Sequence, residues 1–123
     1  MPRAKRDAVG VTYDQLCEFA FTLPGVEEGS SYGTPGLKVR GKFMTRLRED
    51  GVLVVKVGSI MERDFLLKSD VKAFFITDHY REYPAVLVRL DAVPKAVLHE
   101  LLTDAWRRVA PKKLIAIHDG VSR

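Results

Sequence analysis

The sequence predicts an α+β domain in which an antiparallel β-sheet is covered by helices on one face. From Glu27 to Val57 apolar and polar residues alternate with a period of two, which is typical of half-buried strands. Before and after this region, apolar residues recur at helical spacing. Consecutive strands flanked by such helices pack as an α+β sandwich, and 123 residues with 46% hydrophobic content fit one compact domain.

The first half of the chain predicts one helix followed by three or four strands. The stretch "TYDQ" is a capping box in which Thr12 and Gln15 begin the helix, and Pro24 ends it. Strands are expected over residues 37–40, 42–48 and 52–57, with a weaker one over residues 27–32. The buried face is expected to carry Leu37, Val39, Phe43, Thr45, Leu47, Leu53, Val55 and Val57.

Two turns set the register of these strands. A three-residue loop over residues 40–42 would place Val39 opposite Phe43 and keep the apolar faces aligned, so it is favoured over a two-residue turn. The next loop, "EDG", allows Gly51 a left-handed conformation and places Leu47 opposite Leu53.

The second half predicts a helix, two strands and a final helix. Ser59 and Glu62 form a second capping box, and the helix is expected to bury Ile60, Met61, Phe65 and Leu66. "AFFIT" and "AVLVRL" read as strands joined by the loop "DHYREYP". Pro94 opens a helix that Pro111 ends, and a tail or short closing helix follows. The predicted order is α-β-β-β(-β)-α-β-β-α.

The chain divides into a flexible basic arm (residues 1–10), a single domain (11–117) and a C-terminal tail (118–123). No apolar run is long enough to span a bilayer, and no apolar segment follows the basic start as in a secretory signal. Cys17 is the only cysteine, which excludes an internal disulfide and a cysteine-rich zinc site. We expect a cytoplasmic protein without a metal or other cofactor.

Cations on the face opposite the core form the first candidate site. The predicted register places Lys38, Arg40, Arg46, Arg48 and Lys56 on this face, with Lys42 in the turn. Residues two apart on a strand are about 7 Å apart, close to the spacing of phosphates along DNA. The same pattern also fits a solvated sheet face without a partner. Stacking aromatics are absent from this predicted face, which disfavours single-stranded ligands.

The loop "DHYREYP" forms the second candidate site. His79, Tyr80 and Arg81 lie at its tip and would supply a further contact to a ligand. His79 beside Asp78 is also a candidate acid–base pair, but no second catalytic group or metal-ligand spacing accompanies it. We therefore do not expect an enzyme, and a surface turn is the alternative interpretation.

Five segments together resemble the MmcQ/YjbR family and cover roughly Val11 to Leu114. They are "LPGVEEG", "YGTPGLKVRGKFMTRL", "LVVKVG", "AFFITDHYREYPAVLVRLD" and "LLTDAWRRVAPKKL". Leu37 departs from the pattern, because the family often has Phe there. The resemblance implies a CyaY-like fold and a "double-wing" DNA-binding protein, whose wings match residues 38–48 and 78–83. It implies no catalytic residues.

The sequence is therefore consistent with two functions. The first is DNA binding through the basic hairpin, with the loop at His79 as a second contact. The alternative is a small-molecule-binding or resistance protein with a pocket between the sheet and the helices, or near Tyr32 and His79. The oligomeric state is not predicted.

Overall fold

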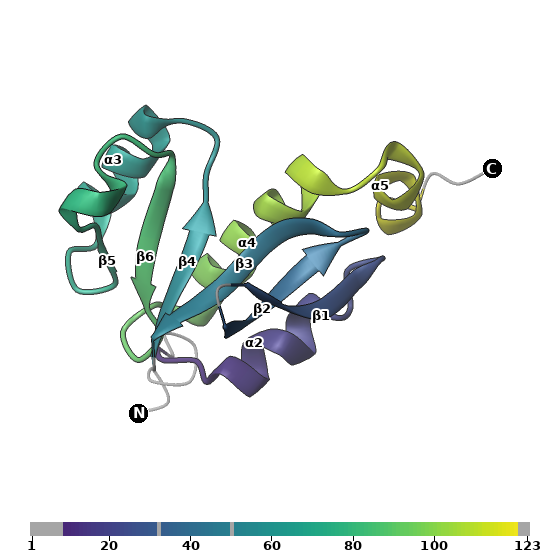
Figure 1. Cartoon of the computed structure of the whole chain (residues 1–123), viewed down its shortest axis with the longest axis horizontal. Helices are drawn as coiled ribbons and strands as arrows, with labels where there is room; N and C mark the ends of the chain where they lie inside the picture. The colour runs from purple at the N-terminus through teal and green to yellow at the C-terminus, as the bar shows by residue number, and fades with distance from the viewer. Residues whose placement is uncertain (1–8, 32, 50, 121–123) are drawn as a thin grey trace, which may run out of the picture.

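A six-stranded antiparallel sheet organises the computed structural model, which describes residues 9–31, 33–49 and 51–120 (Figure 1). The strands follow the order β1-β2-β3-β4-β6-β5. Their bounds are β1 (Val26–Ser31), β2 (Thr34–Val39), β3 (Lys42–Glu49), β4 (Val52–Lys56), β5 (Phe74–Phe75) and β6 (Ala85–Arg89). The predicted α+β class and element order are confirmed. Tyr32, the last residue of the weak strand expected over 27–32, lies outside the described residues.

Helices precede, interrupt and follow the sheet. They are α2 (Tyr13–Ala20), α3 (Ile60–Ser69), the short 3-10 helix η1 (Asp78–Tyr80), α4 (Lys95–Val109) and α5 (Lys112–His118). At α2 the capping box is complete: the Gln15 amide donates to the Thr12 hydroxyl at 3.1 Å, and the Gln15 side chain accepts from the Thr12 amide at 3.0 Å. At α3 the Glu62 carboxylate instead accepts from the Gly58 amide, one residue further back than predicted.

The main core lies between one face of the sheet and the helices α2 and α4. Each of these elements contributes fully buried side chains, such as Leu16 from α2, Val55 from β4 and Leu98 from α4. Trp106 of α4 is also fully buried, and its indole N–H donates to the Pro24 carbonyl at 2.8 Å. This bond attaches α4 to the chain that follows α2.

Cys17 packs into the same core. It lies on the buried side of α2, as the helical spacing of the apolar residues in the sequence indicates. Burial raises the pKa of its thiol, so the side chain stays protonated at neutral pH. Cys17 therefore acts as a small apolar side chain.

The connection between β2 and β3 differs from the prediction. It is a two-residue turn in which Arg40 (φ 52°) and Gly41 (φ 84°) both have positive φ, as in a type I′ hairpin. Val39 consequently pairs with Lys42. A three-residue loop is therefore not needed to align the apolar faces of β2 and β3, because a β-bulge in β3 aligns them instead.

The bulge inserts Met44 as an extra residue in β3. Lys38 pairs with Phe43 and Leu37 pairs with Thr45, so Met44 has no residue opposite it. Met44 is buried in the main core, whereas Phe43 lies on the other face of the sheet. Strand alternation predicts Phe43 in the core and Met44 on the outer face. Both positions are wrong, because the bulge shifts the alternation by one residue.

The β3–β4 hairpin has the predicted register. Leu47 pairs with Leu53, Thr45 pairs with Val55, and Gly51 has a left-handed φ of 79°. A second irregularity leaves Arg48 without a residue opposite it. Strand β4 directs Val54 and Lys56 to the outer face of the sheet, as expected.

Helix α3 contradicts its predicted buried face. Met61 and Phe65 are 81% and 71% exposed, and Ile60 is exposed as well. Arg63 is instead the buried residue of the helix, and the apolar contacts come from the partly buried Leu66 and Leu67. Of the predicted apolar residues, Ile60, Met61 and Phe65 point to solvent, whereas Leu66 packs against the core.

The ends of the chain are described only in part. Val9 forms an isolated bridge with Pro94, and the Gly10 amide donates to the Val93 carbonyl at 2.9 Å. The rest of the arm predicted for residues 1–10, and residues 121–123 of the predicted tail, lie outside the described residues. The closing segment after Pro111 is helical. No helix in the described ranges has the length and apolar character needed to cross a membrane.

Paired glycines on β1 and β2 provide a test of the packing. A Cβ on Gly36 would lie 2.9 Å from the Thr45 carbonyl oxygen, whereas a Cβ on Gly29 would meet only the flexible Lys38 side chain, at 3.1 Å. We expect Gly36→Ala to reduce the free energy of unfolding by about 1–3 kcal/mol, and Gly29→Ala to change it by less than about 1 kcal/mol. Urea denaturation followed by circular dichroism measures both, and equal losses would contradict this packing.

Candidate binding site on the outer face of the sheet

A hollow of about 640 Å³ lies on the outer face of the sheet, opposite the main core. Its size falls in the range of ligand-binding pockets. It joins the two candidate regions, because the hairpin and the loop that contains η1 both line it. The lining residues are Phe43, Arg46, Val54, Lys56, His79, Tyr80, Tyr83 and Ala85.

Arg46 forms one wall of this hollow. Its guanidinium donates to the Tyr80 hydroxyl at 3.3 Å and to the Leu47 carbonyl at 3.4 Å, and it lies 3.5 Å from the Thr34 hydroxyl. Tyr80 is only 9% exposed. These contacts connect β3 to η1, so Arg46 has a structural role in addition to its charge.

Phe43 and Lys56 also line the hollow and lie near each other. The bulge at Met44 turns Phe43 outward, and the Lys56 ammonium lies 6.0 Å from the centroid of its ring. This distance is at the outer limit for a cation–π contact. Lys56 is exposed and makes no ion pair with any residue in the described ranges. The site thus combines a ring and a cation that remain accessible.

The buried Arg63 of α3 fixes the loop that completes the hollow. Its guanidinium donates to the carbonyls of Tyr80, Arg81 and Tyr83 at 3.0, 2.8 and 3.1 Å. It also donates to the Asp64 carboxylate at 2.9 Å. Hydrogen bonds from a charged donor are stronger than neutral ones, so Arg63 holds the loop backbone in one conformation.

The aromatic groups of the loop lie together at the hollow. The ring of His79 meets that of Tyr80 edge-on, with centroids 5.1 Å apart, and lies 6.2 Å from that of Tyr83. Tyr83 is 56% exposed. Arg81 does not line the hollow and pairs with Asp78 at 2.7 Å. No Ser or Cys side chain joins His79 in the lining of this hollow.

The predicted cations separate into paired and unpaired groups. Arg46 is bonded as described above, and Arg48 pairs with Glu49. Four others make no ion pair with residues that the structure describes, and we call them the turn cations: Lys38, Arg40, Lys42 and Lys56. They surround the β2–β3 turn and the end of β4.

Further cations come from the C-terminal helices. Helix α5 lies near the end of β2, since Leu114 and Val39 both approach Gly25, and it begins with Lys112 and Lys113, both exposed (Figure 1). Arg108 at the end of α4 donates to the Lys56 carbonyl at 3.0 Å, which places it at the same end of the sheet. A hydrogen bond from Arg107 lowers the pKa of Asp119 to about 2, so Asp119 stays ionised and keeps the end of α5 attached to α4.

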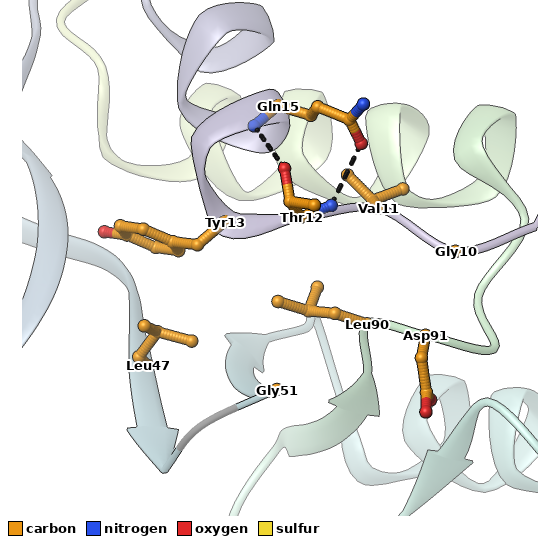
Figure 2. Close-up of a pocket in the computed structure, with 9 residues that line it drawn as sticks. All are labelled: Gly10, Val11, Thr12, Tyr13, Gln15, Leu47, Gly51, Leu90 and Asp91. Carbon is orange, nitrogen blue, oxygen red and sulfur yellow. Dashed lines mark hydrogen bonds between the residues drawn. The ribbon is translucent and has the colours of Figure 1, made fainter.

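A second hollow, of about 410 Å³, lies between the start of α2 and the end of the sheet (Figure 2). Two of its polar side chains, Thr12 and Gln15, bond to each other in the capping box. Figure 2 shows the Asp91 carboxylate pointing away from Leu47 and Leu90. This hollow therefore lacks the converging polar groups of a specific ligand site. Within the described ranges, no three His, Cys, Asp or Glu residues gather as metal ligands.

Comparison with known proteins identifies the family. A family model named YjbR matches residues 21–108, which include the whole sheet and both candidate regions. The chain belongs to the YjbR family. It is also similar to uncharacterized proteins of Mycobacterium tuberculosis and Mycobacterium bovis, each 44% identical over 50 residues. The match covers 41% of this chain and 39% of each relative, so it spans about two fifths of their length.

Sequence reasoning missed Phe43, which lines the hollow, and Arg63, which holds its loop. Phe43 could have been found from "VRGK", because Gly41 in the second turn position permits a two-residue turn. No local sequence pattern marks Arg63 as a site residue, because its carbonyl partners lie 17 to 20 residues away in a loop. The predicted residues Arg46, Lys56, His79 and Tyr80 do meet at one hollow, whereas Arg48 and Arg81 pair with neighbouring carboxylates instead.

Replacing Arg63 tests its hold on the loop. Arg63→Met keeps most of the side-chain volume but leaves three loop carbonyls without their donor, so we expect a loss of about 2–4 kcal/mol in the free energy of unfolding. Asp64→Asn, the control, weakens only a half-exposed ion pair and should cost less than about 1 kcal/mol. Urea denaturation gives both values, and amide hydrogen exchange should show faster opening of residues 78–85 in Arg63→Met. Unchanged exchange in this loop would contradict the role of Arg63.

Proposed function

We propose that this protein binds DNA through its sugar–phosphate backbone, with the turn cations as the main contacts. The main observation in support is that these four cations lie at one end of the sheet and form no ion pairs with the described residues. Unpaired Lys and Arg side chains release counterions from DNA when they bind phosphates. A net charge of +4 is consistent with such a partner.

The conformation of Arg40 supports this proposal. A non-glycine residue with φ of 52° costs about 1 kcal/mol, and Asn or Gly is preferred at this turn position. Stability alone does not favour an exposed arginine there. A phosphate contact gives a reason for it, because strained residues concentrate at binding sites.

The surrounding cations extend the proposed surface. Arg108, Lys112 and Lys113 come from helices at the same end of the sheet, and His79 and Tyr80 of the loop approach it across the hollow. Reduced cysteines are typical of the cytoplasm, which we propose as the location because the one cysteine of the chain is free and buried.

A triple substitution tests the phosphate contacts. Changing Arg40, Lys42 and Lys56 to Ala should weaken binding to a labelled DNA duplex and reduce the slope of log K against log salt by about 2–3, because each lost phosphate contact contributes about 0.9. Fluorescence anisotropy at several salt concentrations measures the slope.

The control for this test removes the same charge elsewhere. It changes to Ala three exposed lysines far from the turn in the sequence: Lys68, Lys72 and Lys95. Its slope should equal that of the wild type. Equal slopes for the two triple variants, or no salt-dependent binding by the wild type, would reject the proposal.

Arg40→Asn separates binding from stability. Asn tolerates the left-handed conformation, so we expect the free energy of unfolding to rise by about 0.5–1 kcal/mol while DNA affinity falls. Urea denaturation and anisotropy on the same preparation measure the two effects. A stabilised variant with unchanged affinity would show that Arg40 does not contact DNA.

A further inference from the structure

We infer that the hollow on the outer face is a base-stacking subsite, so that the preferred ligand is single-stranded rather than duplex nucleic acid. This inference rests on the proposed function and adds the form of the ligand. It depends on Phe43, which the bulge at Met44 places outside the core.

The first support is the combination of rings and cations in one site. Phe43, His79 and Tyr83 line the same hollow, and both His79 and Tyr83 are exposed. Proteins bind single strands by stacking bases on aromatic side chains beside a cationic path for the backbone. In a duplex the bases are stacked on each other, so their faces do not reach such rings.

The second support is the position of Lys56. Lys56 is the one turn cation that lines the hollow, and its ammonium lies 6.0 Å from the Phe43 centroid. A base that stacks on Phe43 would replace this loose contact and leave the ammonium for the adjacent phosphate. The strand would then continue over the β2–β3 turn, where Lys38, Arg40 and Lys42 are located.

The third support is the rigidity of the site. Arg63 fixes the backbone on both sides of Glu82 through the Arg81 and Tyr83 carbonyls, and the contact between Arg46 and Tyr80 connects the loop to β3. A site that is ordered before binding loses less conformational entropy when the ligand arrives. A volume of about 640 Å³ is within the range that accommodates a ligand of nucleotide size.

Stacking is tested by removing rings without changing charge. We expect Phe43→Leu and Tyr83→Leu each to weaken binding of a fluorescein-labelled 12-nucleotide oligo(dT) by roughly 5- to 150-fold, the range for one stacked base. The affinity for a 12-base-pair duplex and both salt slopes should stay unchanged. Phe21→Leu, which alters an exposed phenylalanine outside the hollow, is the matched control and should bind like the wild type. Circular dichroism checks folding, and the exposed Tyr83 keeps the test valid if Phe43→Leu is unstable.

The outcomes separate this inference from the proposed function. Salt-dependent binding of both forms, with no effect of Phe43→Leu or Tyr83→Leu on oligo(dT), would overturn the stacking subsite and leave DNA binding in place. Tighter binding of duplex than of oligo(dT) would also overturn it. Free thymidine monophosphate that binds as tightly as oligo(dT) would assign the hollow to a small molecule instead, whereas no salt-dependent binding of either DNA would reject the proposed function itself.

Discussion

The alignment of β3 with β2 is the constraint on which the core and the candidate site both depend. A turn of only two residues places Val39 opposite Lys42, and uninterrupted alternation from there would set polar residues against apolar ones. The bulge at Met44 corrects this mismatch within two residues. One irregularity therefore gives the core its Met44 and gives the outer face its Phe43.

The outer face is completed by a loop that is bonded to the sheet through Arg46 and Tyr80 and to helix α3 through Arg63. Residues 76–84 run between β5 and β6, and only η1 gives them regular structure. Arg63 supplies the missing order by satisfying three of their carbonyls from the neighbouring helix. A single buried charge thus determines where His79 and Tyr83 stand relative to the hairpin.

Local rules predicted most of the fold, and the errors came from a bulge in β3 and from Arg63, whose partners are distant in sequence. The capping box at Thr12, the register of Leu47 with Leu53 and the buried Val55 follow from residues close together in the sequence or from alternation alone. Phe43 and Met44 exchanged faces because alternation does not reveal a bulge. Arg63 was missed because α3 turns most of its apolar residues to solvent and buries a cation whose partners lie in the η1 loop. The site was therefore predicted as two separate regions, and Phe43, the ring that the hairpin contributes, was assigned to the core instead.

The exposure of α3 has a consequence for how the protein opens in solution. Met61 and Phe65 contribute little to holding this helix, so its attachment relies on Leu66, Leu67 and the bonds of Arg63 to the loop. Because those bonds join the helix to residues 80–83, neither segment can detach alone without breaking them. Helix α3 and the η1 loop should behave as one cooperative unit of local unfolding, while β1 to β4 remain folded as a separate and more stable unit.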